Sequence, residues 1–261
     1  MKRIILTFLV VAGAAALAFY VGLLRMNYPS PKKFPVRGVD VSHHQGGIDW
    51  ATAKEHGVQF AYIKATEGVD FKDPRFVDYW IRCRYAGVAM GAYHFFTFCR
   101  PGAEQAKNFL DTVPLEPGTL PPALDLEFSG NCGRVPSQAE MEREVGAFVR
   151  AISHRFSGPP VFYVTSDFYE RYLTGPKPHF PAHRLWIRNV LREPEQKPRQ
   201  EWTFWQFTGR GRMAGIEGPV DLNIFYGNEE QFTLFKEITS QGRTELPPIW
   251  KPASLLGSGP K

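Results

Sequence analysis

The feature that most constrains the fold of this chain is a regular alternation of strand-like and helix-like segments. Short runs rich in apolar and β-branched residues are followed by longer stretches in which apolar residues recur every three or four positions. This alternation is typical of an α/β protein, with a parallel sheet and helices packed outside it. We expect strands at residues 36–42, 58–66, 88–96, 121–128, 160–165, 184–188, 202–208 and 219–225. Eight strands in about 210 residues fit a small TIM-like (β/α) barrel.

Helices are predicted between these strands from capping residues and apolar periodicity. Ser137 and Glu140 form a capping box at the start of the longest one. Pro74 occupies a favoured first position of another, and Cys83 falls on the apolar face of that helix, so we expect a buried thiol. The expected helices span residues 50–56, 74–86, 101–113, 137–156, 166–173 and 229–238.

Two acidic residues share one face of the fourth predicted strand. Asp125 and Glu127 are two positions apart, so their side chains emerge on the same side, with Cα atoms about 7 Å apart. Taken alone, the pair fits a surface site for Lys or Arg as well as a functional site. Active sites of barrels lie at the C-terminal ends of the strands. The polar residues expected at or just beyond those ends are Asp40, Glu67, His94, Asp125, Glu127 and Asp221.

The N-terminus is basic and then strongly apolar. Lys2 and Arg3 precede an uncharged run from Ile4 to Leu24. A cleaved signal peptide would use the small-x-small site that ends at Ala18, whereas an uncleaved transmembrane anchor would use the whole run. Because the apolar character continues beyond Ala18, we favour the membrane anchor. Both interpretations export the rest of the chain to the periplasm or cell surface, and cleavage near Ala18 would make the protein secreted.

These boundaries predict an anchor or signal segment at 1–25, a linker at 26–35, a barrel at 36–238 and a C-terminal tail at 239–261. The net charge is +5, and removing the basic residues Lys2, Arg3 and Arg25 leaves +2 for the remainder. A charge this small, without a basic helix or stripe, argues against nucleic acid as a partner. We expect a monomer that needs no cofactor.

Two cysteines follow strands that are neighbours in the expected sheet. Adjacent strand ends can bring the Cα atoms of Cys99 and Cys132 within disulfide range. We therefore predict a Cys99–Cys132 bond, with two independent thiols as the alternative. No C-x-x-C motif occurs, which argues against a zinc ribbon or a thioredoxin-like site.

Six segments, in order along the chain, together resemble one enzyme family. They are residues 38–42 (GVDVS), 62–68 (YIKATEG), 91–95 (GAYHF), 125–127 (DLE), 205–208 (WQFT) and 220–223 (VDLN). Each segment alone is weak evidence, whereas six in order on the expected elements are specific. Over about residues 36–238, the chain resembles the family 25 glycoside hydrolases, the Chalaropsis-type lysozymes or N-acetylmuramidases.

This resemblance implies a modified β/α barrel that cleaves peptidoglycan glycan strands between N-acetylmuramic acid and N-acetylglucosamine. The family's acidic positions fall on Asp40, Asp125, Glu127 and Asp221. Glu127 takes the place of the general acid, Asp125 and Asp221 match carboxylates that assist at the sugar's 2-acetamido group, and Asp40 lies at the floor of the site.

A glycosidase needs one carboxylic acid that stays protonated and another group that stays ionised or attacks. We expect the neighbouring aspartate charges to raise the pKa of Glu127, and an apolar surround to raise it further. Asp125 is expected to stay ionised beside it. The second reacting group is open between an enzyme nucleophile, a base holding water and the substrate's acetamido oxygen, and we favour the last.

Other residues near the strand ends are candidates for sugar contacts: Tyr62, Lys64, Glu67, Tyr93, His94, Tyr163, Trp205 and Gln206. For the aromatic residues, packing in a buried strand is the competing interpretation. Lys64 and Glu67 also fit a structural ion pair, and His94 fits a core histidine equally well. The His43-His44 pair has no third ligand at metal-binding spacing, so we expect no metal site.

Other functions compete with peptidoglycan hydrolysis. A chitinase of the related barrel type needs an acid two positions before Asp125, where this chain has Ala123. A non-catalytic barrel that binds peptidoglycan would not need all four acids. A hydrolase of another acetamido-sugar polymer, such as chitin, stays open.

Overall fold

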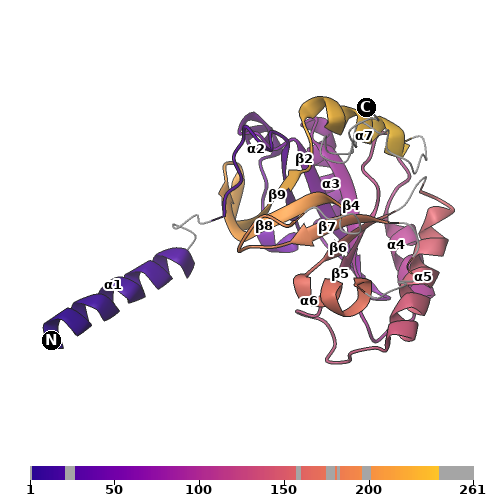
Figure 1. Ribbon diagram of the computed structural model, residues 1–261. Helices are drawn as coiled ribbons and strands as arrows, with labels where there is room; N and C mark the ends of the chain where they lie inside the picture. Colours follow the sequence, from indigo (N-terminus) through magenta and orange to yellow (C-terminus); the bar gives the residue numbers. More distant parts are fainter. Residues whose placement is uncertain are drawn as a thin grey trace, which may run out of the picture.

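The computed structural model describes residues 2–20, 27–156, 160–174, 180, 183–195 and 201–240. Within these residues nine strands form one sheet, and all but β3 (Phe71–Lys72) close into a barrel with helices outside it (Figure 1). The barrel strands are β1 (Arg37–Val41), β2 (Phe60–Glu67), β4 (Ala89–Phe95), β5 (Ala123–Leu126), β6 (Val161–Val164), β7 (Arg184–Arg188), β8 (Trp202–Met213) and β9 (Ile216–Phe225). The predicted α/β barrel is confirmed, with strand bounds within a few residues of those expected.

One strand departs from the expected parallel sheet. Neighbouring barrel strands from β1 through β8 pair in parallel, whereas β9 runs antiparallel to both β8 and β1. The short β3, outside the barrel, is also antiparallel to its neighbour β2. Only Ala214 and Gly215 separate β8 from β9, and a connection this short permits a hairpin but no crossover helix. Gly215 has φ +82°, and a Cβ there would lie 2.3 Å from the carbonyl oxygen of Asp49.

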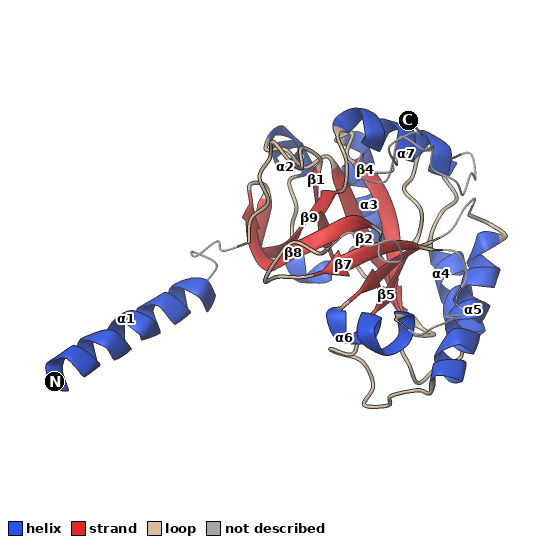
Figure 2. Cartoon of the chain, in the orientation of Figure 1, coloured by secondary structure: helices blue, strands red, loops and turns tan. Residues whose placement is uncertain are grey.

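The helices follow the predicted order and surround the barrel (Figure 2). They are α2 (Trp50–Glu55), α3 (Phe76–Tyr85), α4 (Gly102–Thr112), α5 (Gln138–Ser153), α6 (Ser166–Phe168) and α7 (Glu229–Ser240), with a 3₁₀ turn at His43–Gln45 and a π-helical turn at Tyr169–Leu173. The predicted capping box is present at α5, where the backbone N–H of Ser137 donates to Oε2 of Glu140 at 2.9 Å. This cap satisfies N–H groups that the first helical turn cannot.

The strand side chains divide into two apolar layers. Those pointing inward, such as Trp186 and Phe204, pack with one another inside the barrel. Those pointing outward, such as Ile187, pack under the helices. Phe232 and Phe235 of α7 join the inner layer beside Phe225, the last residue of β9. Apolar side chains therefore fill the barrel interior toward the end that α7 covers. The polar side chains of the interior lie toward the other end.

The N-terminal segment forms a helix, α1 (Lys2–Tyr20), which stands apart from the barrel in Figure 1. Among the described residues, no helix combines the length and the apolar character needed to cross a membrane. The predicted anchor is therefore not supported by the structure, and residues 21–24 of the apolar run lie outside the described part. The predicted linker packs on the barrel: Phe34 is buried, with its ring 6.1 Å from that of Trp205.

The predicted Cys99–Cys132 disulfide is confirmed, with the two Cα atoms 6.3 Å apart. It joins the segment after β4 to the segment after β5. Cys83 is free and buried in the core, also as predicted. Of the predicted C-terminal tail, residues 241–261 lie outside the described part.

We expect replacement of both Cys99 and Cys132 by Ala to lower the free energy of unfolding by about 3–4 kcal/mol, because the bond closes a long loop in the unfolded chain. Chemical denaturation of the two forms measures this difference. Alkylation of the unfolded, non-reduced protein is the matching chemical test, and mass analysis should find one label, on Cys83. Three labels would contradict the bond.

Candidate active site

Four carboxyl groups come together at one end of the barrel interior. Asp40 on β1 and Asp221 on β9 are direct partners in the antiparallel register. Asp125 lies on β5, and Glu127 follows the end of that strand. Charges on Glu127, Asp40 and Asp221 all act on Asp125. The structure therefore brings the four predicted acids into one cluster. Asp221, however, reaches it from the middle of an antiparallel strand, not from the C-terminal end of a parallel one.

Asp40 is buried but well supplied with hydrogen-bond donors. Nδ2 of Asn223 donates to its Oδ1 at 2.6 Å, and Nε2 of Gln206 donates to the same oxygen at 3.1 Å. Both amides are themselves fixed, since Nε1 of Trp186 donates to Asn223 Oδ1 at 2.8 Å and the Tyr163 hydroxyl donates to Gln206 Oε1 at 3.0 Å. Burial raises the pKa of Asp40, while the two amides lower it. Of the four acids, Asp40 is the best able to hold a negative charge.

Asp125 lacks such support. Its Oδ1 is buried and has no hydrogen-bond partner among the described residues. Burial, followed by the charge of Glu127, raises the pKa of Asp125 well above its usual range. The prediction that Asp125 stays ionised is therefore wrong, because a buried carboxylate without donors is strongly disfavoured.

Asp221 shares a hydrogen bond with Asp40, so one of the two carboxyl groups carries the proton between them. Burial, followed by the charge of Asp40, raises the pKa of Asp221 well above its usual range. Gly209 on β8 makes room for this group, because a Cβ there would lie 3.0 Å from Oδ1 of Asp221. The proton shared by this pair is best placed on Asp221, since Asp40 has the amide donors.

Glu127 is half-buried, and burial is the largest cause that raises its pKa to about 7. The cation of Arg188 opposes this rise, and the charges of Asp40 and Asp167 add to it. The predicted direction is confirmed. Both predicted causes act, but their predicted order is reversed, since loss of solvation outweighs repulsion between the acids. A carboxylic acid with this pKa can give or take a proton near neutral pH.

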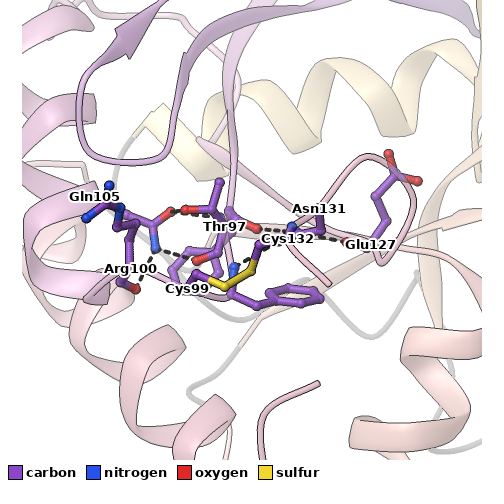
Figure 3. The surroundings of a disulfide bond; sticks show 9 residues. Thr97, Cys99, Arg100, Gln105, Glu127, Asn131 and Cys132 are labelled. Carbon is purple, nitrogen blue, oxygen red and sulfur yellow. Dashed lines mark hydrogen bonds between the residues drawn. A yellow bond between two sulfur atoms is a disulfide. The ribbon is translucent and has the colours of Figure 1, made fainter. Parts of the chain in front are cut away.

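The backbone of Glu127 is tied to the loop after β4 (Figure 3). Nδ2 of Asn131 donates to the carbonyl oxygens of Phe96 at 2.8 Å and Glu127 at 3.0 Å. Oδ1 of Asn131 accepts from the backbone N–H of Phe98 at 2.9 Å. The disulfide begins at the next residue, Cys132, and the Glu127 side chain points away from it (Figure 3). One amide and one covalent bond thus hold the segment that carries Glu127.

Several of the predicted sugar-contact residues lie around the acids. Nζ of Lys64 pairs with Oε2 of Glu67 at 2.6 Å, and the charge of Lys64 acts on Asp125 and Glu127. Tyr93 is half-buried, and burial and the charges of three of the acids raise its pKa. Tyr163 and Gln206 belong to the network that holds Asp40, as described above.

Three other predicted contact residues lie in the core. Tyr62 has no exposed surface, and its hydroxyl donates to the carbonyl oxygen of Pro121 at 3.2 Å. Trp205 packs in the outer layer and donates from Nε1 to the carbonyl oxygen of Asn189 at 2.8 Å. His94 is buried between Thr66 and Gln105, and burial lowers its pKa to about 3. Strand alternation explains Trp205 and His94, because each neighbours a residue that faces the interior.

The His43-His44 pair is a structural feature of the loop after β1. Nδ1 of His43 lies 2.8 Å from Oδ2 of the buried Asp73, and the two imidazole rings lie 4.0 Å apart. In the part of the chain that the structure describes, no group of three or more His, Cys, Asp or Glu is placed to hold a metal ion.

The sequence analysis missed three residues that shape this site: Asn223, Arg188 and Asn131. Asn223 lies two positions after Asp221 on one strand face, and Arg188 lies two positions after the inward-facing Trp186. The rule that found Asp125 and Glu127 would have found both. Asn131 lies in a loop, and no pattern in the sequence points to its contacts.

Comparison with known proteins gives a consistent family. The model of glycosyl hydrolases family 25 matches residues 39–216. Uncharacterized protein YegX of Escherichia coli (strain K12) is 34% identical over 210 residues, covering 78% of this chain and 75% of that protein. Lysozyme M1 of Streptomyces globisporus is 35% identical over 208 residues, covering 74% and 68%. The solved structure of a family 25 glycosyl hydrolase from Bacillus anthracis superimposes with a TM-score of 0.73 at 35% identity, covering 79% of this chain and 95% of that one.

The raised pKa of Glu127 predicts how stability depends on pH. The folded protein keeps this proton up to about pH 7, against an ordinary value of 4.5, so this group makes the free energy of unfolding fall as the pH rises between these values. The Glu127→Gln substitution removes this pH-dependent fall in the free energy of unfolding, because glutamine does not titrate. Thermal unfolding of the two forms should give similar Tm values near pH 4 and a higher Tm for the variant above pH 7.5.

The exposed Glu201 provides the matched control, because Glu201→Gln makes the same chemical change away from the acids. It should follow the wild-type curve at every pH. A Tm difference between Glu127→Gln and wild type that does not change with pH would contradict the burial-raised pKa.

Proposed function

Because this chain belongs to family 25 of the glycosyl hydrolases, we propose that it hydrolyses peptidoglycan at the β-1,4 bond between N-acetylmuramic acid and N-acetylglucosamine. Membership of the family makes the chain a glycoside hydrolase. The substrate and the bond are our inference, supported by its similarity to a lysozyme and by the chemistry of the acid cluster.

The observation that carries the proposal is the half-buried carboxyl group of Glu127, whose pKa is raised to about 7 beside three further acids. Glycosidic bonds break when an acid protonates the leaving oxygen, and the best acid has a pKa near the working pH. Glu127 meets this requirement, and the Asn131 contacts fix its backbone. We assign Glu127 as the proton donor and, later in the cycle, as the base that activates water.

The other three acids divide the remaining tasks. Asp40, which accepts from Asn223 and Gln206, is the group that stays ionised and stabilises the positive charge developing on the sugar. Asp125 and Asp221 hold protons or share them, so they can exchange hydrogen bonds with the substrate's 2-acetamido group. The acetamido oxygen then attacks the anomeric carbon as the leaving oxygen takes the proton from Glu127.

The proposed substrate lies outside the cytoplasmic membrane, so this function requires export. The basic and then apolar N-terminus supports export, either as a cleaved signal peptide or as an anchor. We place the catalytic unit in residues 36–238 and expect it to act as a monomer in the periplasm or at the cell surface.

Two other functions compete with this one. A barrel that only binds peptidoglycan would have no use for an acid with a pKa near 7. A hydrolase of another acetamido-sugar polymer, such as chitin, would share the chemistry and differ in the sugar recognised. The two alternatives predict different products from purified substrates.

We expect Glu127→Gln to reduce the release of soluble muropeptides from purified cell wall by about 10²–10⁴-fold, because the variant cannot protonate the leaving oxygen. Mass spectrometry of the digest identifies the product and its reducing-end sugar, which should be N-acetylmuramic acid. The matched control Glu201→Gln should digest the wall like wild type. A wild-type protein that binds wall without releasing muropeptides would support the binding barrel, and cleavage of chitin alone would support the other hydrolase.

Attack by the acetamido oxygen predicts that the product keeps the configuration of the substrate. The first displacement inverts the anomeric carbon and the attack of water inverts it again. Proton NMR of the freshly released reducing end, recorded before mutarotation, should therefore show the β anomer. A first-formed α anomer would exclude the acetamido route and favour direct attack of a water molecule held by one of the aspartates.

A further inference from the structure

Arg188 ends β7 at the same end of the barrel as the four acids. Side chains two positions apart on a strand share a face. Trp186 lies inside the barrel, with its ring centroid 4.9 Å from that of Tyr163, and Ile187 lies in the outer layer. Arg188 therefore faces the interior side. It lies one step beyond Trp186 toward the end of the barrel that holds the four acids, which we call the mouth. It also pairs in register with Gln206, the residue whose amide holds Asp40.

The guanidinium of Arg188 is exposed and has no hydrogen-bond or ion-pair partner among the residues that the structure describes. Its charge nonetheless acts on Asp40, Glu127 and Asp221. Lys64, a second cation that acts on the acids, is engaged by Glu67 at 2.6 Å and lies over the ring of Phe95. Of these two cations, Arg188 is the one whose charge is unpaired and whose donors are all unused among the described residues.

The acids do not use Arg188 as a salt-bridge partner, and the reasons are visible in their contacts. Asp40 takes its hydrogen bonds from two amides, and burial keeps protons on Asp125 and Glu127. A free guanidinium presents a planar fork of N–H donors that matches a carboxylate. An anionic substrate that approaches a cluster of acids also needs a nearby cation to offset repulsion.

We propose that Arg188 is a specificity-determining residue that binds a carboxylate of the substrate glycan, and so favours strands containing muramic acid over neutral acetamido-sugar polymers. This inference rests on the proposed function. The carboxylate has two possible sources on one polymer: the lactyl group of muramic acid where no peptide is attached, and the stem peptide where one is. Both present the same chemistry to Arg188.

Binding tests this inference without turnover. The Glu127→Gln protein serves as the background, and Arg188→Ala, Arg188→Lys and Arg192→Ala are each added to it. Arg192 is exposed and lies four positions further along the chain, so Arg192→Ala controls for the loss of one positive charge. The ligands are peptide-bearing and peptide-free muramyl oligosaccharides, each compared with a form whose carboxylates are converted to methylamides. Calorimetry gives Kd, and circular dichroism with Tm checks that each variant is folded.

Arg188→Ala should raise Kd for the carboxylate ligands about tenfold to a hundredfold, as expected for losing a hydrogen-bonded ion pair. It should leave Kd for the methylamide ligands within about twofold. Arg188→Lys should recover part of the affinity, since it keeps the charge without the fork, and Arg192→Ala should bind like the background. A loss confined to the peptide-bearing ligand identifies the stem peptide as the source, and a loss that includes the peptide-free ligand identifies the lactyl group.

Equal Kd changes for the carboxylate and methylamide ligands would overturn the inference, and so would no change at all. If Arg188 only tunes Glu127, Arg188→Ala in the enzyme with Glu127 intact will shift the pH profile of kcat without raising KM for the carboxylate substrate. Failure of the proposed function looks different: the wild type releases no muropeptides, while the binding measurement still reports on Arg188. Each hypothesis can therefore fail alone.

Discussion

The hydrogen bonds that Asn223 and Gln206 donate to Asp40 are the interactions on which the mouth of the barrel depends. Four carboxyl groups share a buried space, and several ionised carboxylates there would cost several kcal/mol each. The amides make one charge tolerable, at 2.6 Å and 3.1 Å from the same oxygen. Once Asp40 carries that charge, its repulsion favours protons on its neighbours. Burial is the larger cause that favours protons on the other three groups, and the two amides decide which carboxyl group carries the charge. Trp186 and Tyr163 hold these amides in place from inside the barrel.

The reversed direction of β9 is what makes this arrangement possible. A parallel strand offers the mouth only its C-terminal end, whereas β9 passes the mouth in mid-strand. Asp221 and Asn223 are two positions apart on β9, so both face the interior, opposite Asp40 and Gly38 of β1. One strand therefore supplies both an acid of the cluster and an amide that supports Asp40. The short turn at Gly215 reverses the chain into β9. It thereby brings both Asp221 and Asn223 beside Asp40.

Much of this could be predicted from the sequence, and what could not has identifiable physical reasons. Strand and helix alternation predicted the barrel, the spacing of Asp125 and Glu127 predicted a shared face, and adjacent strand ends predicted the Cys99–Cys132 bond. Periodicity does not report strand direction, so β9 was expected to run parallel. It also does not say which face is inside, and Trp205 was therefore placed with the sugar contacts. Tyr62 does point inward, but it is fully buried against Trp186. The predicted charge state of Asp125 was wrong for a further reason. Asp125 looks like Asp40 in the sequence, and only the hydrogen-bond donors around each carboxyl group distinguish the two.

Arg188 connects recognition of the substrate to the chemistry of Glu127. Burial raises the pKa of Glu127, and the Arg188 cation is the largest opposing influence. A carboxylate bound to Arg188 would neutralise much of that cation, so the pKa of Glu127 should be higher in the complex than in the free enzyme. Binding and protonation are then reciprocally linked: the anionic substrate favours the protonated acid, and the protonated acid favours the anionic substrate. A neutral polymer bound at the same site would leave the cation in place and would gain nothing from this linkage. Discrimination by Arg188 would therefore act on the proton transfer as well as on affinity.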